Sequence, residues 1–429
     1  MNYDAPWWLP GGNLQTIWAA LHSQRYLGPP PVFRRERWAT PDGDFVDVDY
    51  VDMAPTLPTS CGSLPPEGAG LARGGPSLRP LAATLPTACG SLPPEGAHFS
   101  SGRPFGKTVA STLVASHTAL RPQAAFPDRP EPVEGQTRGG TPACLERSAS
   151  AQRAATLPGA DAGCRQPLLI VFHGLEGSSA SHYAEAFAAV AQSRGWACAV
   201  PHFRGCSGEI NLAARAYHSG DFEEIDWMLR RFRQTCAGPL LAVGISLGGN
   251  ALMRWAAESG AAGRAVVSAV ASVCSPLDLA ASGAAIGRGF NRLVYTGMFL
   301  RSMKPKALQK LAQHPGLFDL GRLLAARTLY DFDNVFTAPL HGFKDTDDYW
   351  TRASAKPHLH RIALPALALN ARNDPFVPVA SLPGAADASR HLTLWQPAEG
   401  GHVGFPSGPF PGHVRAMPEA VVAFLAAQL

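Results

Sequence analysis

The segment Gly244-Ile245-Ser246-Leu247-Gly248-Gly249-Asn250 constrains the fold of this chain more than any other feature. It follows the apolar run at 239–243 and precedes a helix-like run at 251–259, so the sequence predicts a strand, a sharp turn and a helix. Ser246 stands at the apex with glycine two residues to either side, which lets the backbone turn tightly and leaves the hydroxyl projecting above a sheet. The hypothesis is a nucleophilic serine, and the alternative is a glycine-rich turn without chemistry.

The alternation of strand and helix extends along the chain from residue 167. Strand-like runs lie at 167–173, 196–202, 239–245, 265–274, 365–370 and 391–396, and helix-like runs lie at 180–194, 218–236, 247–259 and 414–428. Apolar strands separated by helices predict an α/β fold, with a mostly parallel central sheet and helices on both faces. Residues 277–360 interrupt the alternation with helix-like pieces such as 317–330, which predicts a helical cap over the strand ends.

Two further segments precede this core. Residues 32–50 alternate polar and apolar side chains around Thr40-Pro41-Asp42-Gly43, which predicts a β-hairpin within an N-terminal segment covering 1–53. Residues 54–166 hold 16 of the 39 prolines and no Ile, Trp or Tyr, and the stretch 56–69 recurs as 84–97 with one substitution. We expect a low-complexity, disordered insertion between the second and third strands, followed by the core at 167–429. A regulatory or partner-binding segment is the alternative.

Composition excludes several classes of function. The net charge is only +4, and the chain has no block of five like charges, so nothing indicates binding to nucleic acid or to an anionic membrane. The cysteines have no C-x-x-C spacing, and Cys198, Cys206, Cys236 and Cys274 are interpreted as buried thiols. The longest weakly polar run, 265–281, is too short and too polar to span a bilayer, and no secretory signal is recognised. A soluble, cytoplasmic protein without metal or cofactor is expected.

A nucleophilic serine needs a base to accept its proton and an acid to hold that base. Both must come from loops at the carboxyl ends of the parallel strands. Asp374 follows the strand-like run at 365–370, and His402 follows the run at 391–396, so these two residues are the predicted acid and base. Asp278 is the alternative acid and His413 the alternative base, and Asp374 before a proline is also compatible with a simple turn cap.

An oxyanion intermediate needs two preorganised N–H donors. The first expected donor is the backbone of Leu247, at the start of the helix that follows the serine. The second is the backbone of Leu175, in the glycine-rich turn after the strand at 167–173. This turn lacks the Lys-Ser/Thr pair of a phosphate-binding loop, and His173 is expected to anchor it by hydrogen bonding.

The chain resembles the YheT-type branch of the α/β-hydrolases, bacterial relatives of the eukaryotic abhydrolase-domain esterases. The motifs that carry the resemblance occur in the family's order and are Pro6 to Thr16, Thr40 to Phe45, His173 to Ser178, Arg204 to Glu209, Tyr217 to Gly220, Gly244 to Asn250, Asn373 to Phe376 and Gly401 to Phe405. They cover nearly all of 5–53 and 167–429, whereas the 54–166 insertion departs from the family pattern.

The resemblance implies an α/β-hydrolase fold and a cofactor-free serine esterase acting on carboxylic esters, of short-chain or acylglycerol type. Two alternatives remain open: an acyltransferase or thioesterase with the same triad, and a catalytically silent scaffold that binds a small molecule. Four apolar residues of the cap are expected either to line an acyl pocket or to pack between helices, namely Met298, Phe299, Leu300 and Met303. The identity of the ester and the oligomeric state stay open.

Overall fold

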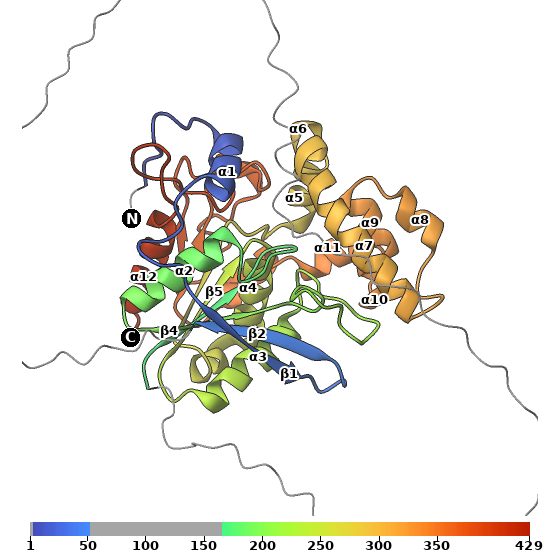
Figure 1. Ribbon diagram of the computed structural model, residues 1–429, viewed down its shortest axis with the longest axis horizontal. Coiled ribbons are helices and arrows are strands. Elements are labelled where there is room, and N and C mark those ends of the chain that lie inside the picture. The colour runs from blue at the N-terminus through green and yellow to red at the C-terminus, as the bar shows by residue number, and fades with distance from the viewer. Residues whose placement is uncertain (1–2, 52–164) are drawn as a thin grey trace, which may run out of the picture. The chain divides into compact units, whose positions relative to one another are not determined.

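A computed structural model describes residues 3–51 and 165–429, which contain one eight-stranded sheet (Figure 1). The strands follow the order β1-β2-β4-β3-β5-β6-β7-β8 across the sheet. Their bounds are β1 Phe33–Ala39, β2 Phe45–Val51, β3 Leu168–Phe172, β4 Ala197–Pro201, β5 Leu240–Ile245, β6 Ala269–Val273, β7 Ala366–Leu369 and β8 Leu392–Trp395. Each of the strand-like runs recognised from residue 167 onward therefore contains one strand of the sheet.

Pairing is antiparallel at one edge and parallel elsewhere. β1 pairs with β2 across the turn at 40–44, with Ala39 opposite Phe45, and β2 pairs antiparallel with β4. All pairs from β4 through β3, β5, β6 and β7 to β8 are parallel. This is the mostly parallel sheet that the sequence predicts, and the parallel strands bring the loops after β3, β5, β7 and β8 to one edge.

Helices cover both faces of the sheet because side chains alternate along each strand. Ile170 and Phe172 of β3 join one buried cluster with α3 and α4, whereas Leu169 and Val171 join a second cluster with α2 and α12. The helices of this core are α1 Gly12–Leu21, α2 His182–Ser193, α3 Phe222–Thr235, α4 Leu247–Ser259 and α12 Ala416–Ala426. Of these, α1 was not predicted; it begins directly after Pro10 and Gly11.

Between β6 and β7 the chain is helical. Its α-helices are α5 Leu279–Ile286, α6 Gly289–Asn291, α7 Gly297–Gln313, α8 Leu320–Ala325, α9 Leu329–Val335, α10 Thr337–Leu340 and α11 Thr346–Ala353, with the π-helical turn η3 Arg292–Thr296 before α7. The prediction of one helix over 317–330 is wrong. Thr328 accepts a hydrogen bond from the N–H of Asp331, and Asp331 accepts one from the N–H of Thr328, so a capping box starts a new helix here.

Three other predictions concern the fold. Cys198, Cys206, Cys236 and Cys274 are free and buried, as expected. Within 3–51 and 165–429 no helix is both long enough and apolar enough to cross a membrane. The expected insertion at 54–166 lies, except for its last two residues, outside the described residues.

A buried ion cluster holds the β1–β2 hairpin against the core. Arg204 pairs with Asp42 at 2.7 Å, with Asp44 at 2.8 Å and with Glu224 of α3 at 2.7 Å. Burial raises the pKa of Glu224 to about 8, so this carboxyl is expensive to ionise. The cluster therefore joins two of the recognised motifs, 40–45 and 204–209, and its role is to fix the hairpin turn.

Candidate active site

Ser246 occupies the turn between the end of β5 and the start of α4. Its φ of 51° is left-handed, which is strained for a residue with a side chain. The turn is tight because α4 approaches the neighbouring strand closely: a Cβ on Gly248 would lie 2.5 Å from the carbonyl oxygen of His173. Glycine is thus required at this position, and the arrangement matches the sharp turn predicted from the sequence.

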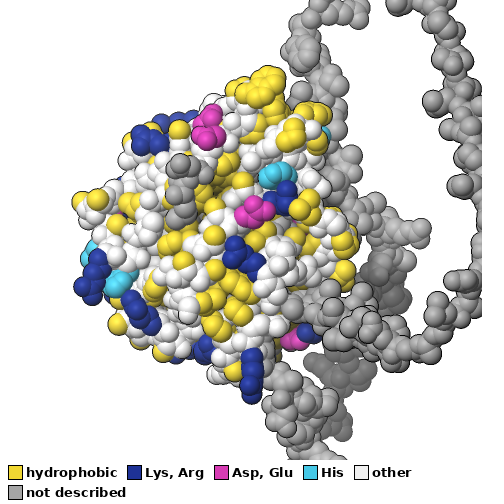
Figure 2. All heavy atoms as spheres, turned by 90° about the vertical axis from the view of Figure 1, so that its left-hand side faces the viewer, with side chains coloured by type: hydrophobic (Ala, Val, Ile, Leu, Met, Phe, Trp, Pro, Cys, Tyr) yellow, Lys and Arg dark blue, Asp and Glu magenta, His cyan; other side chains and the backbone are white. Residues whose placement is uncertain are grey.

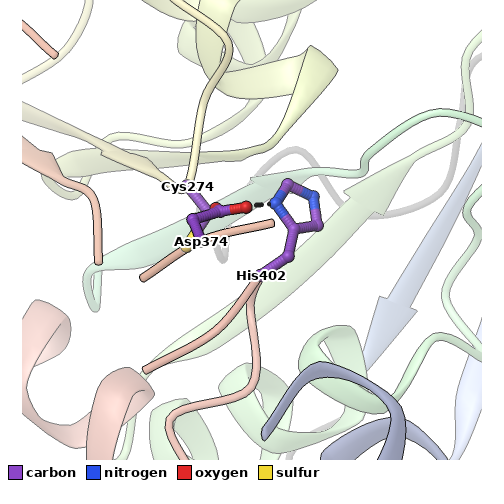
Figure 3. A group of neighbouring side chains, drawn as sticks. All are labelled: Cys274, Asp374 and His402. Carbon is purple, nitrogen blue, oxygen red and sulfur yellow. Dashed lines mark hydrogen bonds and ion pairs between the residues drawn. The ribbon is translucent and has the colours of Figure 1, made fainter. Parts of the chain in front are cut away.

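Three predicted side chains meet at this turn. The Nε2 atom of His402 lies 3.0 Å from the Oγ atom of Ser246, and its Nδ1 atom lies 2.8 Å from the Oδ2 atom of Asp374 (Figure 3). The carboxylate of Asp374 is completely buried, and its Oδ1 accepts hydrogen bonds from the N–H groups of Phe376 and Val377. With the carboxylate accepting from Nδ1–H, Nε2 is left as the acceptor that faces the serine hydroxyl.

The alternative acid and base lie in other environments. Asp278 caps α5 by accepting a hydrogen bond from the N–H of Ala281 at 3.0 Å. His413 accepts a 3.4 Å hydrogen bond from the N–H of Arg415. Neither side chain has a hydrogen bond to Ser246 or His402 among the described residues, so the geometry favours Asp374 and His402.

Cys274 lies behind the acid and the base (Figure 3). Its sulfur, one Asp374 oxygen and one His402 nitrogen lie within 4.8 Å of one another, a spacing that suits metal ligands. The thiol accepts a hydrogen bond from the N–H of Val403 at 3.2 Å, and burial raises its pKa well above the ordinary value. A neutral thiol is a poor metal ligand, and the imidazole already bridges the carboxylate and the serine. The group therefore fits a packed support for the histidine loop better than a metal centre.

The expected oxyanion donors lie next to the serine. Leu247 is the first residue of α4, and Leu175 lies in the turn after β3, where a Cβ on Gly174 would come within 3.3 Å of the Cβ of Ser246. Hydroxyl groups of Tyr183 and Tyr217 accept from the N–H groups of Gly174 and Glu176, the two neighbours of Leu175. Neither expected donor N–H has a hydrogen-bond partner in the part of the chain that the structure describes.

His173 anchors the glycine-rich turn after β3 by hydrogen bonding, as expected. Its Nε2 atom accepts a hydrogen bond from the N–H of Phe203 at 3.0 Å, and its Nδ1 atom then donates to the carbonyl of Gly174 at 2.8 Å. Burial lowers the pKa of His173 from 6.5 to about 3, so the ring stays neutral and keeps this tautomer at neutral pH. The two tyrosines and His173 together hold the turn rigid beside Ser246.

Sequence reasoning gave no role to the N-terminal motif, which braces the acid and histidine loops. The Oε1 atom of the fully buried Gln15 accepts hydrogen bonds from the Nδ2 of Asn373 and the N–H of Gly400, both at 2.9 Å. Thr16 accepts a hydrogen bond from the N–H of His402 at 2.8 Å. The available signal for this role was the presence of two polar residues, a glutamine and a threonine, in a motif rich in glycine and aromatic residues. Their partners could not be identified from the sequence because they lie more than 350 positions away.

Two further contacts join the helical segment to the site. Asn250, the last residue of the serine motif, donates to the carbonyls of Ser219 and Ala353 and accepts from the N–H of Ala355. Lys306 of α7 forms a 2.9 Å ion pair with Glu176 in the oxyanion turn. The helices after β6 are thus tied directly to the turns on both sides of Ser246.

A pocket with an empty volume of about 1120 Å³, part of it open to solvent, leads away from Ser246 and His402. Most of its wall is apolar, with contributions from Leu279, Ile286, Phe299, Met303, Phe332 and Trp350. Of the four cap residues named from the sequence, Phe299 and Met303 line this pocket. Leu300 packs between helices, which was the other expected environment, and the expectation is wrong only for Met298, which is exposed. Helix periodicity alone did not tell the inner face of α7 from its outer face.

Comparisons with known proteins show what the chain is similar to. The family model for the alpha/beta hydrolase fold matches residues 167–409. "Putative esterase YheT" of Escherichia coli (strain K12) is 42% identical over 246 residues, which are 57% of this chain and 72% of that protein. "Phospholipase ABHD3" of Mus musculus is 27% identical over 271 residues, 63% of this chain and 65% of that protein. "Monoacylglycerol lipase ABHD2" of Homo sapiens is 28% identical over 274 residues, 60% of this chain and 64% of that protein.

Proposed function

This chain belongs to the α/β-hydrolase family, in its YheT-type branch of carboxylic ester hydrolases, and we propose that it cleaves its substrate through an acyl-enzyme on Ser246. The observation that carries the proposal is the double contact of one imidazole: His402 lies 3.0 Å from the serine hydroxyl and 2.8 Å from the Asp374 carboxylate. These are the contacts that a general base needs to take a proton and to be stabilised once it carries one.

In the first step, His402 takes the proton of Ser246 as the serine oxygen attacks the ester carbonyl. The resulting oxyanion is held by the N–H groups of Leu247 and Leu175, and the positive end of the α4 dipole adds to this stabilisation. His402 then gives its proton to the departing alcohol, which leaves the acyl group on Ser246. The acyl-enzyme and the released alcohol together contain all the atoms of the enzyme and the ester.

In the second step, water takes the place of the alcohol. His402 removes a proton from the water as it attacks the acyl-enzyme, and returns that proton to Ser246 when the acid leaves. Asp374 holds the imidazole in the required tautomer and stabilises its positive charge throughout. Its complete burial strengthens this electrostatic effect, because solvent does not screen the pair.

The pocket supports an ester with a substantial apolar acyl chain. Its wall is mostly apolar, which suits an acyl chain longer than the two carbons of an acetyl group. The names of two relatives, a phospholipase and a monoacylglycerol lipase, point to the same class of lipid ester. We therefore propose acylglycerol-type esters as the substrate class, with short-chain esters accepted as poorer substrates.

The test is hydrolysis of p-nitrophenyl esters from C2 to C16 by the wild type, Ser246→Ala and the control Ser193→Ala on the surface of α2. We expect the first variant to lose about 10⁴-fold or more in kcat, because the nucleophile is gone, and the control to retain full activity. Rates should rise from C2 toward the longer chains that fill the pocket. Equal rates for Ser246→Ala and the wild type would refute the assignment. Diversion of the acyl group to an added alcohol would favour acyl transfer over hydrolysis.

A further inference from the structure

The segment around the start of α7 is unusually basic. Between Asp278 and Asp319 the chain has six Lys and Arg residues and no acidic residue. The three lysines of this stretch have protein partners, since Lys304 and Lys310 donate to backbone carbonyls and Lys306 pairs with Glu176. The three other cations of the stretch are Arg288, Arg292 and Arg301.

Arg288, Arg292 and Arg301 are exposed, and none of their guanidinium groups has a hydrogen bond or ion pair within the described residues. The charge of Arg292 contributes to lowering the pKa of Asp331, although the capping hydrogen bonds of that carboxylate lower its pKa more. That carboxylate is already held by the N–H groups of Arg327 and Thr328. The positive charge of the three guanidinium groups is therefore not neutralised within this part of the fold.

Large apolar side chains are exposed on the same segment. Leu293 is 81% exposed, Phe290 52% and Met298 45%, and all three lie within nine residues of sequence. Single exposed apolar residues are ordinary, but a group of them interleaved with arginines is typical of segments that lie in a membrane interface. We call these six residues the mouth patch: Arg288, Phe290, Arg292, Leu293, Met298 and Arg301.

The mouth patch is the outer side of the pocket wall. Ile286, just before the patch, and Phe299, between Met298 and Arg301, line the pocket. From within the patch segment, the ring of Tyr295 packs on Phe376 at 4.5 Å, and Phe376 packs on His402 at 4.2 Å. A surface that docks through this segment would therefore lie two side chains away from the base.

Helix α1 lies beside the segment that carries the mouth patch. Asn13 accepts a hydrogen bond from the hydroxyl of Tyr295, which places α1 beside the patch, and the next residue, Leu14, is exposed. No acidic residue occurs between Asp4 and Glu36. Figure 1 shows α1 and α6 at the same end of the molecule, and Figure 2, which faces the side away from α6, shows apolar, acidic and basic side chains near that end.

We propose that the mouth patch docks this protein on the surface of an anionic phospholipid bilayer. The three arginines contact lipid phosphates, and Phe290, Leu293 and Met298 enter the boundary between headgroups and acyl chains. The occupant is a bilayer because unpaired cations and exposed apolar groups alternate here, and because the pocket behind the segment has an apolar wall. The purpose of this docking, which is to pass a lipid ester from the bilayer into the pocket, rests on the proposed function; the docking itself does not.

The test measures binding separately from catalysis. The full chain carrying Ser246→Ala is sedimented with vesicles of phosphatidylcholine alone or with 30% phosphatidylglycerol. We expect binding to the anionic vesicles that weakens as salt is added, and far weaker binding to the neutral ones. At about fivefold per arginine, the triple change Arg288→Ser, Arg292→Ser, Arg301→Ser should weaken anionic binding on the order of 10²-fold. Leu293→Ser should weaken it by about tenfold.

Matched controls lie elsewhere on the surface: Leu212→Ser replaces another exposed leucine, and Arg390→Ser another exposed arginine. Both should bind as the unchanged patch does. Equal binding of patch and control variants, or no binding to anionic vesicles, would overturn the proposal. A change in oligomeric state of the patch variants without vesicles would also overturn it, in favour of an interface between copies of the chain.

The two proposals fail in different ways. In the catalytically active background, the patch variants should hydrolyse a soluble short-chain ester at the wild-type rate but lose activity on a lipid ester held in anionic vesicles. If Ser246→Ala keeps esterase activity, the acyl-enzyme proposal fails and vesicle binding still decides the docking. If Ser246→Ala is inactive but does not bind vesicles, only the docking proposal fails.

Discussion

Replacing Gln15 by leucine should damage both stability and catalysis, because one buried amide connects three segments. The Nε2 atom of Gln15 donates to the carbonyl of Leu9 at 3.0 Å, and its Oε1 atom accepts from Asn373 and Gly400. Leucine has a similar size, so little cavity forms. The loss is therefore one of hydrogen bonds in a site from which solvent is excluded.

The magnitude follows from the groups left without partners. Gln15→Leu strands one carbonyl, one backbone N–H and one amide N–H, and each such buried group costs about 1–3 kcal/mol. Relaxation of the loops recovers part of this cost, and single substitutions seldom exceed about 4–5 kcal/mol. We expect the free energy of unfolding to fall by about 3 kcal/mol.

Catalysis should fall as well, because Asn373 and Gly400 belong to the loops that carry Asp374 and His402. On the proposed mechanism, a displacement of about 1 Å between base and nucleophile costs on the order of 10²-fold in rate. The KM should change little, since no residue of α1 lines the pocket. Urea unfolding gives the stability, and ester hydrolysis gives kcat and KM separately.

Gln309→Leu, on the exposed face of α7, is the matched control and should leave both quantities unchanged. The reasoning would be refuted if Gln15→Leu unfolded within about 0.5 kcal/mol of the wild type and kept its kcat within twofold. A stability loss without a loss of kcat would mean that the brace supports the fold but does not position the histidine.

Two further results are expected. Gly248→Ala should lower kcat at least tenfold, because its Cβ would lie 2.5 Å from the carbonyl oxygen of His173 and force the serine turn away from the oxyanion turn; Gly297→Ala, where nothing lies within 4 Å, should keep full activity. Burial raises the pKa of Asp333 from 3.8 to about 6, so between these values the folded state binds more protons and stability falls as pH rises. Urea titrations from pH 4 to 7 should show the wild type losing about 3 kcal/mol relative to Asp333→Asn, and parallel pH profiles would contradict this account.

Local sequence patterns were sufficient to predict those strands and turns whose conformation depends mainly on neighbouring residues. The apolar runs before Ser246 and Asp374 are strands buried on both faces of a parallel sheet, and the run before His402 is the edge strand, with Thr393 exposed. The Asp-Gly turn gave the hairpin for the same reason, since its conformational preference is local. The prediction of one helix over 317–330 was wrong because Thr328 caps the start of a new helix inside this range. The periodicity of apolar residues does not reveal such a cap.

The candidate site could be predicted as a set of residue types but not as a geometry. Parallel topology requires the loops after β5, β7 and β8 to share one edge, which is why the order of serine, acid and histidine in the sequence was informative. That rule does not choose between Asp374 and Asp278. The choice depends on which carboxylate reaches the imidazole at 2.8 Å and which caps a helix, and both are outcomes of packing.

The sequence by itself determined the strand order along the chain, the strained serine turn and the residue types available for acyl transfer, because each depends on contacts among neighbours. Only the tertiary structure decided that Gln15 and Thr16 brace the acid and histidine loops, and that Arg288, Arg292 and Arg301 stand beside exposed apolar side chains. Both depend on which distant segments meet and on which face of a short helix is covered. A formal charge of +4 does not report such a local concentration, because only folding gives the lysines of this segment partners that its arginines lack within residues 3–51 and 165–429.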